Sequence, residues 1–224
     1  MAETVLAIAV HPDDETLGCG GTLLRHLELG DQTHWLIITK MSKERGFSET
    51  QITDREQQIN QVANIYGFNS VTRLGLDAGY VDALPMAELV QKIGSVIDKV
   101  RPNVVYLPYL FDAHSDHRSV FQSAFAATKC FRHPFIRKVL MMETQSETDF
   151  AVSSNAHTFS PNYFVNISNQ LRKKIAIAEV YREEFGEHPF PRSARNIEAL
   201  ATVRGAMAGF EFAEAFQLLK EICD

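Results

Sequence analysis

Two short clusters of histidines and aspartates have the residue types and the spacing of a metal-dependent hydrolytic site. The first is His11-Pro-Asp-Asp-Glu15 and the second is His114-Ser-Asp-His117. Two neutral imidazoles and one carboxylate form a three-ligand site that leaves a coordination position open for water, which is the arrangement of catalytic zinc. Such a cation lowers the pKa of its water ligand to about 7 and polarises a carbonyl oxygen. We assign the three ligands to His11, Asp14 and His117.

The remaining side chains of the two clusters are candidates for proton transfer. Asp13 stands beside a ligand and can act as a general base. His114 can act as a general acid or stabilise an oxyanion, and Asp116 can orient an imidazole. Simpler interpretations exist, because a His-x-x-His pattern often lies on a helix surface and an acidic run after a strand often marks a helix N-terminus. The metal interpretation therefore requires a fold that brings the two clusters together.

Other catalytic motifs do not fit the chain. Gly18-Cys-Gly20-Gly21 is similar to a glycine-rich dinucleotide turn, but Leu23 stands where the third glycine is required. The sequence contains neither a phosphate-binding G-x-x-x-x-G-K-[ST] loop nor a G-x-S-x-G nucleophile motif. Iron oxygenases also use two histidines and one carboxylate, but their His-x-Asp spacing differs from the His-x-x-Asp spacing here.

The predicted secondary structure positions the two clusters at one edge of a sheet. Apolar runs predict strands over 5–10, 34–39, 71–74 and 103–107, and amphipathic stretches between and after them predict helices over 21–29, 53–66, 86–100 and 117–128. This alternation indicates a mostly parallel sheet covered by helices on both faces. In the strand order 3-2-1-4, the first and fourth strands are neighbours, and ligands bind at their carboxyl ends. Because each cluster directly follows one of these two strands, we expect the clusters to face each other.

The second half of the chain is less regular. Its pattern predicts strands over 138–142 and 163–165 and helices near 168–185, 194–207 and 210–222. Two polar segments, 41–52 and 186–193, are predicted loops, and the first is a candidate lid or substrate loop. We therefore predict an α/β, Rossmann-like fold forming a single domain over 1–224. Its core would span 1–135, and a C-terminal strand and helix elaboration over 136–224 would complete the substrate pocket.

Composition excludes several classes of protein. The chain has 22 basic and 28 acidic residues, a net charge of −6, which disfavours nucleic acid as a partner. Cys19, Cys130 and Cys223 are far apart and form no C-x-x-C pair, so neither a disulfide framework nor a cysteine zinc site is expected. The apolar run over 5–10 is too short for a signal peptide or a membrane span. We expect a cytoplasmic protein without a membrane span; homo-oligomerisation stays open.

The sequence resembles the GlcNAc-PI de-N-acetylase family, also called PIG-L or LmbE-like. The segments that carry the resemblance are AIAVHPDDETLGCGGTLLR, Thr39 with Arg55-Glu56, RPNVVYLP with AHSDHR, FSPNYFVNIS and the RSARNIEALATVRGAMAGFEFAEAF tail. They run through almost the whole chain, and the combination of HPDDE with H-x-D-H is highly specific. Members of this family are zinc-dependent deacetylases of N-acetylglucosamine-type sugars with a Rossmann-like fold.

The resemblance implies roles that agree with the chemistry of the two clusters. His11, Asp14 and His117 match the metal ligands, which would hold Zn²⁺ or, alternatively, Fe²⁺. Asp13 matches the general base, and His114 matches the group that stabilises the oxyanion or protonates the leaving amine, with Asp116 as its partner. The resemblance also implies that three further residues contact substrate: Arg55, whose alternative is an ordinary charge in the first turn of a helix, and His188 and Arg192 in the 186–193 loop.

The expected reaction is hydrolysis of an N-acetyl group on an N-acetylglucosamine-type sugar or glycoside, with release of acetate. The absence of an N-terminal membrane helix favours a soluble, small-molecule glycoside over a lipid-embedded one. Two alternatives remain. One is a metal-dependent amidohydrolase of a non-sugar amide, and the other is a non-catalytic sugar-binding module, which would have no need for a base and an acid beside its metal.

Overall fold

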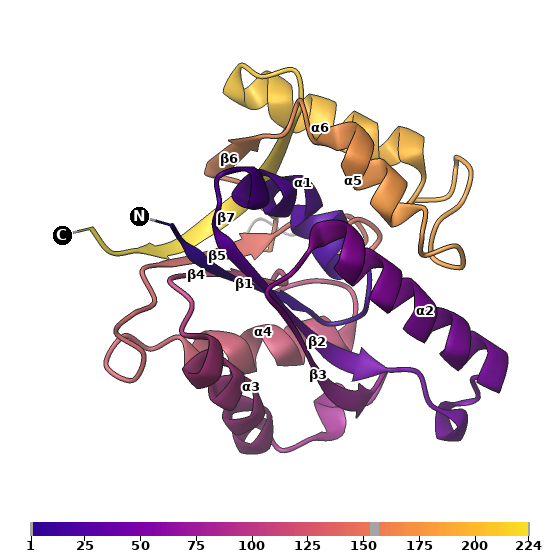
Figure 1. The fold of residues 1–224 in the computed structure, drawn as a ribbon, viewed down its shortest axis with the longest axis vertical. Helices are drawn as coiled ribbons and strands as arrows, with labels where there is room; N and C mark the ends of the chain where they lie inside the picture. Colours follow the sequence, from indigo (N-terminus) through magenta and orange to yellow (C-terminus); the bar gives the residue numbers. More distant parts are fainter. Residues whose placement is uncertain (1, 153–156, 224) are drawn as a thin grey trace.

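A computed structural model describes residues 2–152 and 157–223 of the protein. At its centre is a mixed sheet with the strand order β3-β2-β1-β4-β5-β7-β6 (Figure 1). Strands β1 to β5 pair in parallel, whereas β7 is antiparallel to both β5 and β6. Along the chain the elements are β1 (Thr4–Ala9), α1 (Asp14–Glu28), β2 (Gln32–Lys40), η1 (Lys43–Arg45), α2 (Glu49–Tyr66), β3 (Ser70–Asp77), η2 (Val81–Ala83), α3 (Met86–Val100), β4 (Val104–Leu107), α4 (Ser115–Ala127), β5 (Lys138–Met142), β6 (Tyr163–Asn166), α5 (Leu171–Ala178), α6 (Ala194–Ala208) and β7 (Ala213–Glu221).

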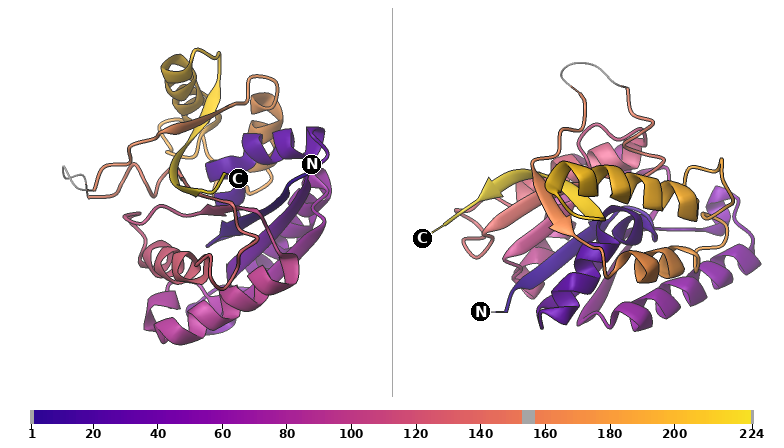
Figure 2. Two further views of the ribbon diagram at one scale, coloured as in Figure 1. Left: turned by 90° about the vertical axis from the view of Figure 1, so that its left-hand side faces the viewer. Right: turned by 90° about the horizontal axis from the view of Figure 1, so that it is seen from above.

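Helices cover both faces of the sheet. Leu6 and Ile8 of β1 belong to a core cluster with residues of α3 and α4, whereas Val5, Ala7 and Ala9 belong to a second cluster with residues of α1 and α2. Figure 1 shows α3 and α4 on one side of the strands and α1 and α2 on the other, and Figure 2 shows α5 and α6 on the α1 side. Burial on both faces explains why β1 reads as an uninterrupted apolar run.

Several predictions from the sequence are confirmed. The fold is α/β, and the first four strands take the predicted order 3-2-1-4 within the larger sheet. Helix α3 has the predicted bounds of Met86–Val100, and β5 has the predicted bounds of Lys138–Met142. The apolar spacing of α3 is helical throughout, which is why its ends could be located.

Helix α1 begins at Asp14, not at the predicted Gly21, so the first acidic cluster lies in its first turn. Two glycines of this helix are required by packing, because a Cβ on Gly20 would meet the Tyr66 hydroxyl at 2.6 Å and one on Gly21 would meet Ile167 at 2.8 Å. Cys19 has non-helical torsions (φ −143°, ψ 20°), which kink the helix in its middle.

Helix α2 also begins earlier than predicted. Ser48, not Thr53, is its N-cap, and the side chains of Ser48 and Gln51 form the capping box. The predicted 41–52 loop is therefore shorter and contains the 3₁₀ turn η1.

The predicted C-terminal helix over 210–222 is wrong, because this segment is strand β7. Its sequence, AEAFQLLKE, is rich in residues that favour helices, but it pairs with β5 on one side and β6 on the other. These tertiary contacts override local propensity. The predicted helix near 168–185 is shorter than expected, since α5 covers only Leu171–Ala178.

Over the described ranges, none of the helices has both the length and the apolar character needed to cross a bilayer.

Candidate active site

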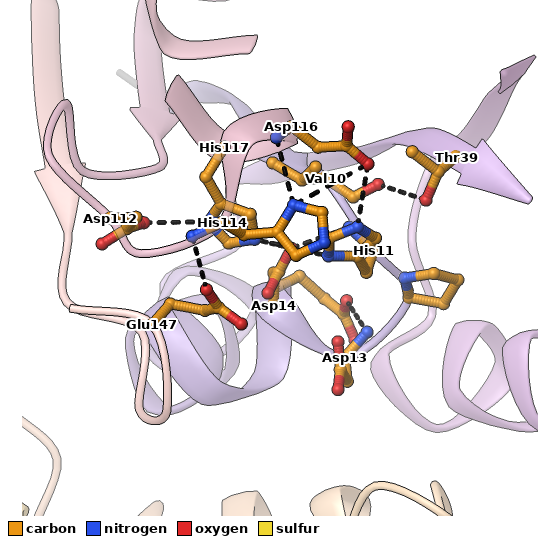
Figure 3. Close-up of polar contacts among 12 residues, drawn as sticks. Val10, His11, Asp13, Asp14, Thr39, Asp112, His114, Asp116, His117 and Glu147 are labelled. Carbon is orange, nitrogen blue, oxygen red and sulfur yellow. Dashed lines mark hydrogen bonds and ion pairs between the residues drawn. The ribbon is translucent and has the colours of Figure 1, made fainter. Parts of the chain in front are cut away.

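The two histidine and aspartate clusters lie at the carboxyl ends of neighbouring parallel strands. β1 pairs directly with β4, and helices α1 and α4 begin shortly after them. Asp14 is the first residue of α1, and His114 is the N-cap of α4. Figure 3 shows the imidazoles of His11, His114 and His117 gathered beside Asp14. The fold therefore brings together the residues that the sequence analysis paired.

Three side-chain atoms from His11, Asp14 and His117 are positioned to hold one cation. His117 Nε2 lies 3.3 Å from Asp14 Oδ2 and 3.4 Å from His11 Nδ1, and His11 Nδ1 lies 3.9 Å from Asp14 Oδ2. Ligands at about 2.0–2.1 Å from a tetrahedral metal ion are about 3.4 Å apart. The donor set and its spacing thus fit a zinc-sized ion, with a fourth position left for water or substrate.

Asp112 orients the imidazole of His117. His117 Nδ1 donates to Asp112 Oδ2 at 2.8 Å, and both side chains are fully buried. The carboxylate is held in turn by the Thr148 hydroxyl, at 2.6 Å from Oδ1, and by the backbone N–H of Tyr109. With Nδ1 protonated, the Nε2 lone pair faces Asp14 and His11, as a metal ligand requires.

Asp116 holds His11 in the same manner from the other side. Its Oδ2 lies 3.4 Å from His11 Nε2, which leaves His11 Nδ1 for the cluster. The backbone N–H groups of Gly79 and Val81 donate to the Asp116 carboxylate at 2.6 and 3.0 Å. Although burial raises the pKa of Asp116, these hydrogen bonds lower it below its usual value. Asp116 is therefore an anionic support for His11 rather than a proton donor.

His11, His114 and Asp116 form a second group, among the described residues, with three potential ligand atoms close together. Two of its potential ligand groups already accept hydrogen bonds. Asp116 accepts two backbone N–H groups, and His114 Nδ1 accepts the backbone N–H of Asp116 at 3.1 Å. The group of His11, Asp14 and His117 is consequently the better cation site.

His114 is fixed as a neutral hydrogen-bond donor. Because its Nδ1 accepts a backbone N–H, the ring proton of the neutral form resides on Nε2. Burial and the neighbouring His11 lower the pKa of His114. Its side chain is 35% exposed, so a ligand can reach it. Glu147 fixes the backbone, since its Oε2 accepts the His114 N–H at 3.1 Å.

Asp14 and His117 each shift the pKa of the other. Burial alone raises the pKa of Asp14, but His117 and His11 hold it well below its usual range. Burial likewise lowers the pKa of His117, yet Asp14 and Asp112 raise it well above its ordinary value. The pocket therefore stabilises a positive charge between carboxylates, as a cation site must.

Asp13 is a buried carboxylate next to the cluster, held in a strained conformation. Its φ of 139° lies in a region that non-glycine residues rarely adopt, and its backbone N–H donates to Glu15 Oε2 at 3.1 Å. Burial raises the pKa of Asp13 to about 7, against the opposing charge of Arg192. A carboxylate with such a pKa can take up and release a proton near neutrality.

The three residues expected to contact substrate have different positions. Arg192 Nη1 lies 2.8 Å from Asp13 Oδ2 and therefore belongs to the site. Arg55 is buried, and its guanidinium donates to the Pro12 carbonyl at 3.0 Å and to Glu184 at 2.8 Å, which supports the turn before Asp13. His188 is exposed, and the described contacts do not link it to the cluster.

Three acidic residues of the site were not predicted from the sequence. Asp112 stands just before the second cluster, and its place two residues before His114 was the one available signal. Glu147 and Glu184 are far from both clusters along the chain. Only the tertiary structure shows that Glu147 binds the His114 backbone and that Glu184 binds both Arg55 and Arg192.

The comparisons with known proteins agree with this site. Residues 6–128, which include both clusters, match the family model described as PIG-L, GlcNAc-PI de-N-acetylase. Diacetylchitobiose deacetylase of Thermococcus kodakarensis is 27% identical over 228 residues, which cover 97% of this chain and 84% of that protein.

Solved structures share the fold. The conserved protein TT1542 from Thermus thermophilus has a TM-score of 0.77 at 26% identity, with 99% of this chain and 97% of that one covered. GalB, the 4-carboxy-2-hydroxymuconate hydratase from Pseudomonas putida, has a TM-score of 0.76 at 18% identity, with 99% and 98% covered. The second likeness shows the fold alone, so the activity has to be argued from the site.

Proposed function

The chain belongs to the GlcNAc-PI de-N-acetylase family, and from this premise we propose that it is a metal-dependent hydrolase that removes the acetyl group from an N-acetylated amino sugar or glycoside. The observation that carries the proposal is the geometry of His11, Asp14 and His117, with a raised-pKa carboxylate on Asp13 beside them. The similarity to a diacetylchitobiose deacetylase supports the choice of an N-acetylated sugar.

Zn²⁺ is the proposed metal, held by His11 Nδ1, Asp14 Oδ2 and His117 Nε2, and Fe²⁺ is the alternative because two histidines and a carboxylate also suit ferrous iron. When bound, such a cation supplies Lewis acidity toward an amide carbonyl and acidifies a coordinated water.

The side chains of this protein move the protons. Asp13 accepts the proton of the attacking water, whose oxygen forms a bond to the acetamide carbon. His114 Nε2–H donates a hydrogen bond to the developing oxyanion, because its Nδ1 is occupied by a backbone N–H. The C–N bond then breaks, and the proton held by Asp13 passes to the departing amine. The products are acetate and the free amino sugar.

Acetate release from N,N′-diacetylchitobiose by the purified protein tests the proposal. We expect stoichiometric metal, loss of activity on treatment with a chelator, and its return with Zn²⁺ or Fe²⁺. Simple acetamides serve as the comparison, since equal turnover of acetamide and sugar would favour the non-sugar amidohydrolase instead. Protein without stoichiometric metal and without acetate release after metal addition would contradict the proposal.

A further inference from the structure

A cavity of about 250 Å³ adjoins the metal-ligand cluster, and His11 and Pro12 form part of its wall. The other lining residues come from β2, from the segment between β2 and α2, from α2, from β3 with the turn that follows it, and from Glu184 after α5. The apolar lining residues are Ile37, Met41, Phe47, Ile52, Ile59 and Ala78. Because His11 belongs to both the metal-ligand cluster and the wall of the cavity, a single substrate molecule can contact the cluster and fill the cavity.

Four charged side chains of this wall form pairs with one another, whereas the buried Nε of Arg55 has no hydrogen-bond partner among the described residues. Arg55 is paired with Glu184, and Arg73 is paired with Glu56. The hydroxyl of Thr39 donates to a backbone carbonyl at 2.8 Å. Apart from the Nε–H of Arg55, the wall offers few free hydrogen-bonding groups, so a polar guest would lose hydrogen bonds to water that this cavity mostly does not replace, whereas an apolar guest has none to lose.

Size and position define what the cavity can hold. Its volume exceeds the roughly 150 Å³ that suffices to hold a benzene molecule in a protein interior, so an aromatic ring or a short alkyl chain fits. The proposed reaction releases acetate, and the acyl group of its substrate contributes only a methyl group. The apolar part must then belong to the group attached to the sugar.

We propose that this cavity binds the apolar aglycone of an N-acetylated amino-sugar glycoside while the acetamide lies at His11, Asp14 and His117. The inference rests on the proposed deacetylase function and makes it more specific. Phe47 and Ile52, which are half-buried and line the cavity, are the residues that select for such substrates. Arg45 holds the segment that carries Phe47 in place, since it lies over the Tyr80 ring and 3.3 Å from Asp77.

The test compares the methyl, propyl and hexyl β-glycosides of N-acetylglucosamine in the holoenzyme. We expect kcat/KM for acetate release to rise roughly three- to fourfold for each added methylene until the cavity is filled. In Phe47→Ala and Ile52→Ala the preference for hexyl over methyl falls at least tenfold. Ile65→Ala, a half-buried residue of α2 outside the cavity, is the matched control and keeps the preference.

Two further experiments distinguish failure of the cavity assignment from failure of the proposed deacetylase function: calorimetry with glucosides, and assays of methyl glycosides with longer N-acyl groups. Calorimetry with methyl and hexyl β-glucosides, which lack the acetamide, measures aglycone binding without turnover. If hexyl glucoside binds more tightly and Phe47→Ala removes the difference, the cavity assignment stands even where no acetate is released and the deacetylase proposal fails. If acetate is released with no dependence on aglycone length, the assignment is overturned. A length dependence found only with longer N-acyl groups on the methyl glycoside also overturns it.

Discussion

The guanidinium of Arg192 lies 2.8 Å from the carboxylate of Asp13, although 179 residues separate the two in the chain. The same Nη1 is 2.8 Å from Glu184 Oε2, and Arg192 Nε donates to the Ser146 hydroxyl at 2.6 Å. The 186–193 loop, which precedes α6, therefore positions the side chain that we propose as the general base. Arg192 had been expected to contact substrate, and its position in the structure favours a supporting role.

Replacing Arg192 by Gln should reduce both stability and activity. The change leaves the Asp13 and Glu184 carboxylates without their shared cation, and we expect a loss of about 2 kcal/mol in the free energy of unfolding. Displacement of Asp13 should lower kcat roughly 10- to 100-fold while KM changes little. Urea unfolding and steady-state kinetics measure the two effects.

Arg204→Gln, which breaks the 2.9 Å contact that Arg204 of α6 makes with Glu143, is the control and should leave kcat unchanged. A kcat as high as that of the wild type in Arg192→Gln would contradict the positioning role.

Substitution of Asp13 by Asn should separate proton transfer from metal binding. The amide cannot accept a proton from water, so we expect acetate release to fall roughly 10²- to 10⁴-fold. The proposed ligand atoms belong to His11, Asp14 and His117, and the metal content should therefore stay at the wild-type level. Elemental analysis and an acetate assay check both expectations. The exposed Asp82→Asn controls for the loss of one negative charge. Full activity in Asp13→Asn would rule out its assignment as the base.

Loss of the carboxylate behind His117 should weaken metal binding. In Asp112→Asn the His117 ring loses a buried charged partner, and we expect the affinity for Zn²⁺ to fall roughly 10- to 100-fold. Competition with a chromophoric chelator measures this affinity. Asp98→Asn is a close control, because Asp98 contacts the Nε2 atom of His133 at 3.0 Å in a histidine–carboxylate pair outside the site. Equal zinc affinities in the two variants would show that Asp112 does not support the ligand.

The stability of the fold should depend on His34 in mild acid. Burial lowers the pKa of His34, whose Nδ1 lies 2.7 Å from the Ser70 hydroxyl on the neighbouring strand. Just below a pH of about 6.5, the imidazole of His34 is protonated in the unfolded chain but stays neutral in the folded protein. Stability is therefore lost as the pH falls through this range. His34→Leu should lose less stability than the wild type between about pH 7.5 and about pH 5.5. Urea midpoints at both pH values provide the measurement, and the exposed His188→Leu should behave as the wild type does.

The sequence predicted the parallel part of the fold because its signals are local. Uninterrupted apolar runs marked β1, β2 and β4, and helical spacing marked α3. The strand order then followed from the general preferences of α/β sheets. The same reasoning placed His11 and His117 at one edge without any knowledge of their contacts.

The sequence failed where structure depends on distant partners. Strand β7 has a helix-forming composition and is extended only because β5 and β6 flank it. Glu184 could not be linked to the site, since its role consists of contacts with Arg55 and Arg192. Helix α1 begins before the predicted Gly21, and its glycines Gly20 and Gly21 pack closely against Tyr66 and Ile167, which are distant in the chain.

The kink in α1 is held by a buried ion pair from the C-terminal part of the chain. Glu214 of β7 accepts the backbone N–H groups of Gly21 and Thr22 at 2.8 and 2.7 Å. Lys174 of α5 donates to Glu214 at 2.7 Å and to the Leu17 carbonyl at 2.8 Å. These contacts satisfy polar backbone groups on both sides of the kink at Cys19.

We expect Lys174→Met to destabilise the protein by about 3–5 kcal/mol, because it leaves the Glu214 carboxylate buried without its cation. Asp14 begins the same helix, so the variant should also bind Zn²⁺ more weakly than the wild type. The partly exposed pair of Lys138 on β5 and Glu221 on β7 offers the matched control. Glu221→Gln should cost less than about 1 kcal/mol and leave zinc affinity unchanged. Urea unfolding and zinc competition measure both quantities. If Lys174→Met proved destabilised but bound zinc as tightly as the wild type, the ion pair would stabilise the fold without positioning the metal ligand on α1.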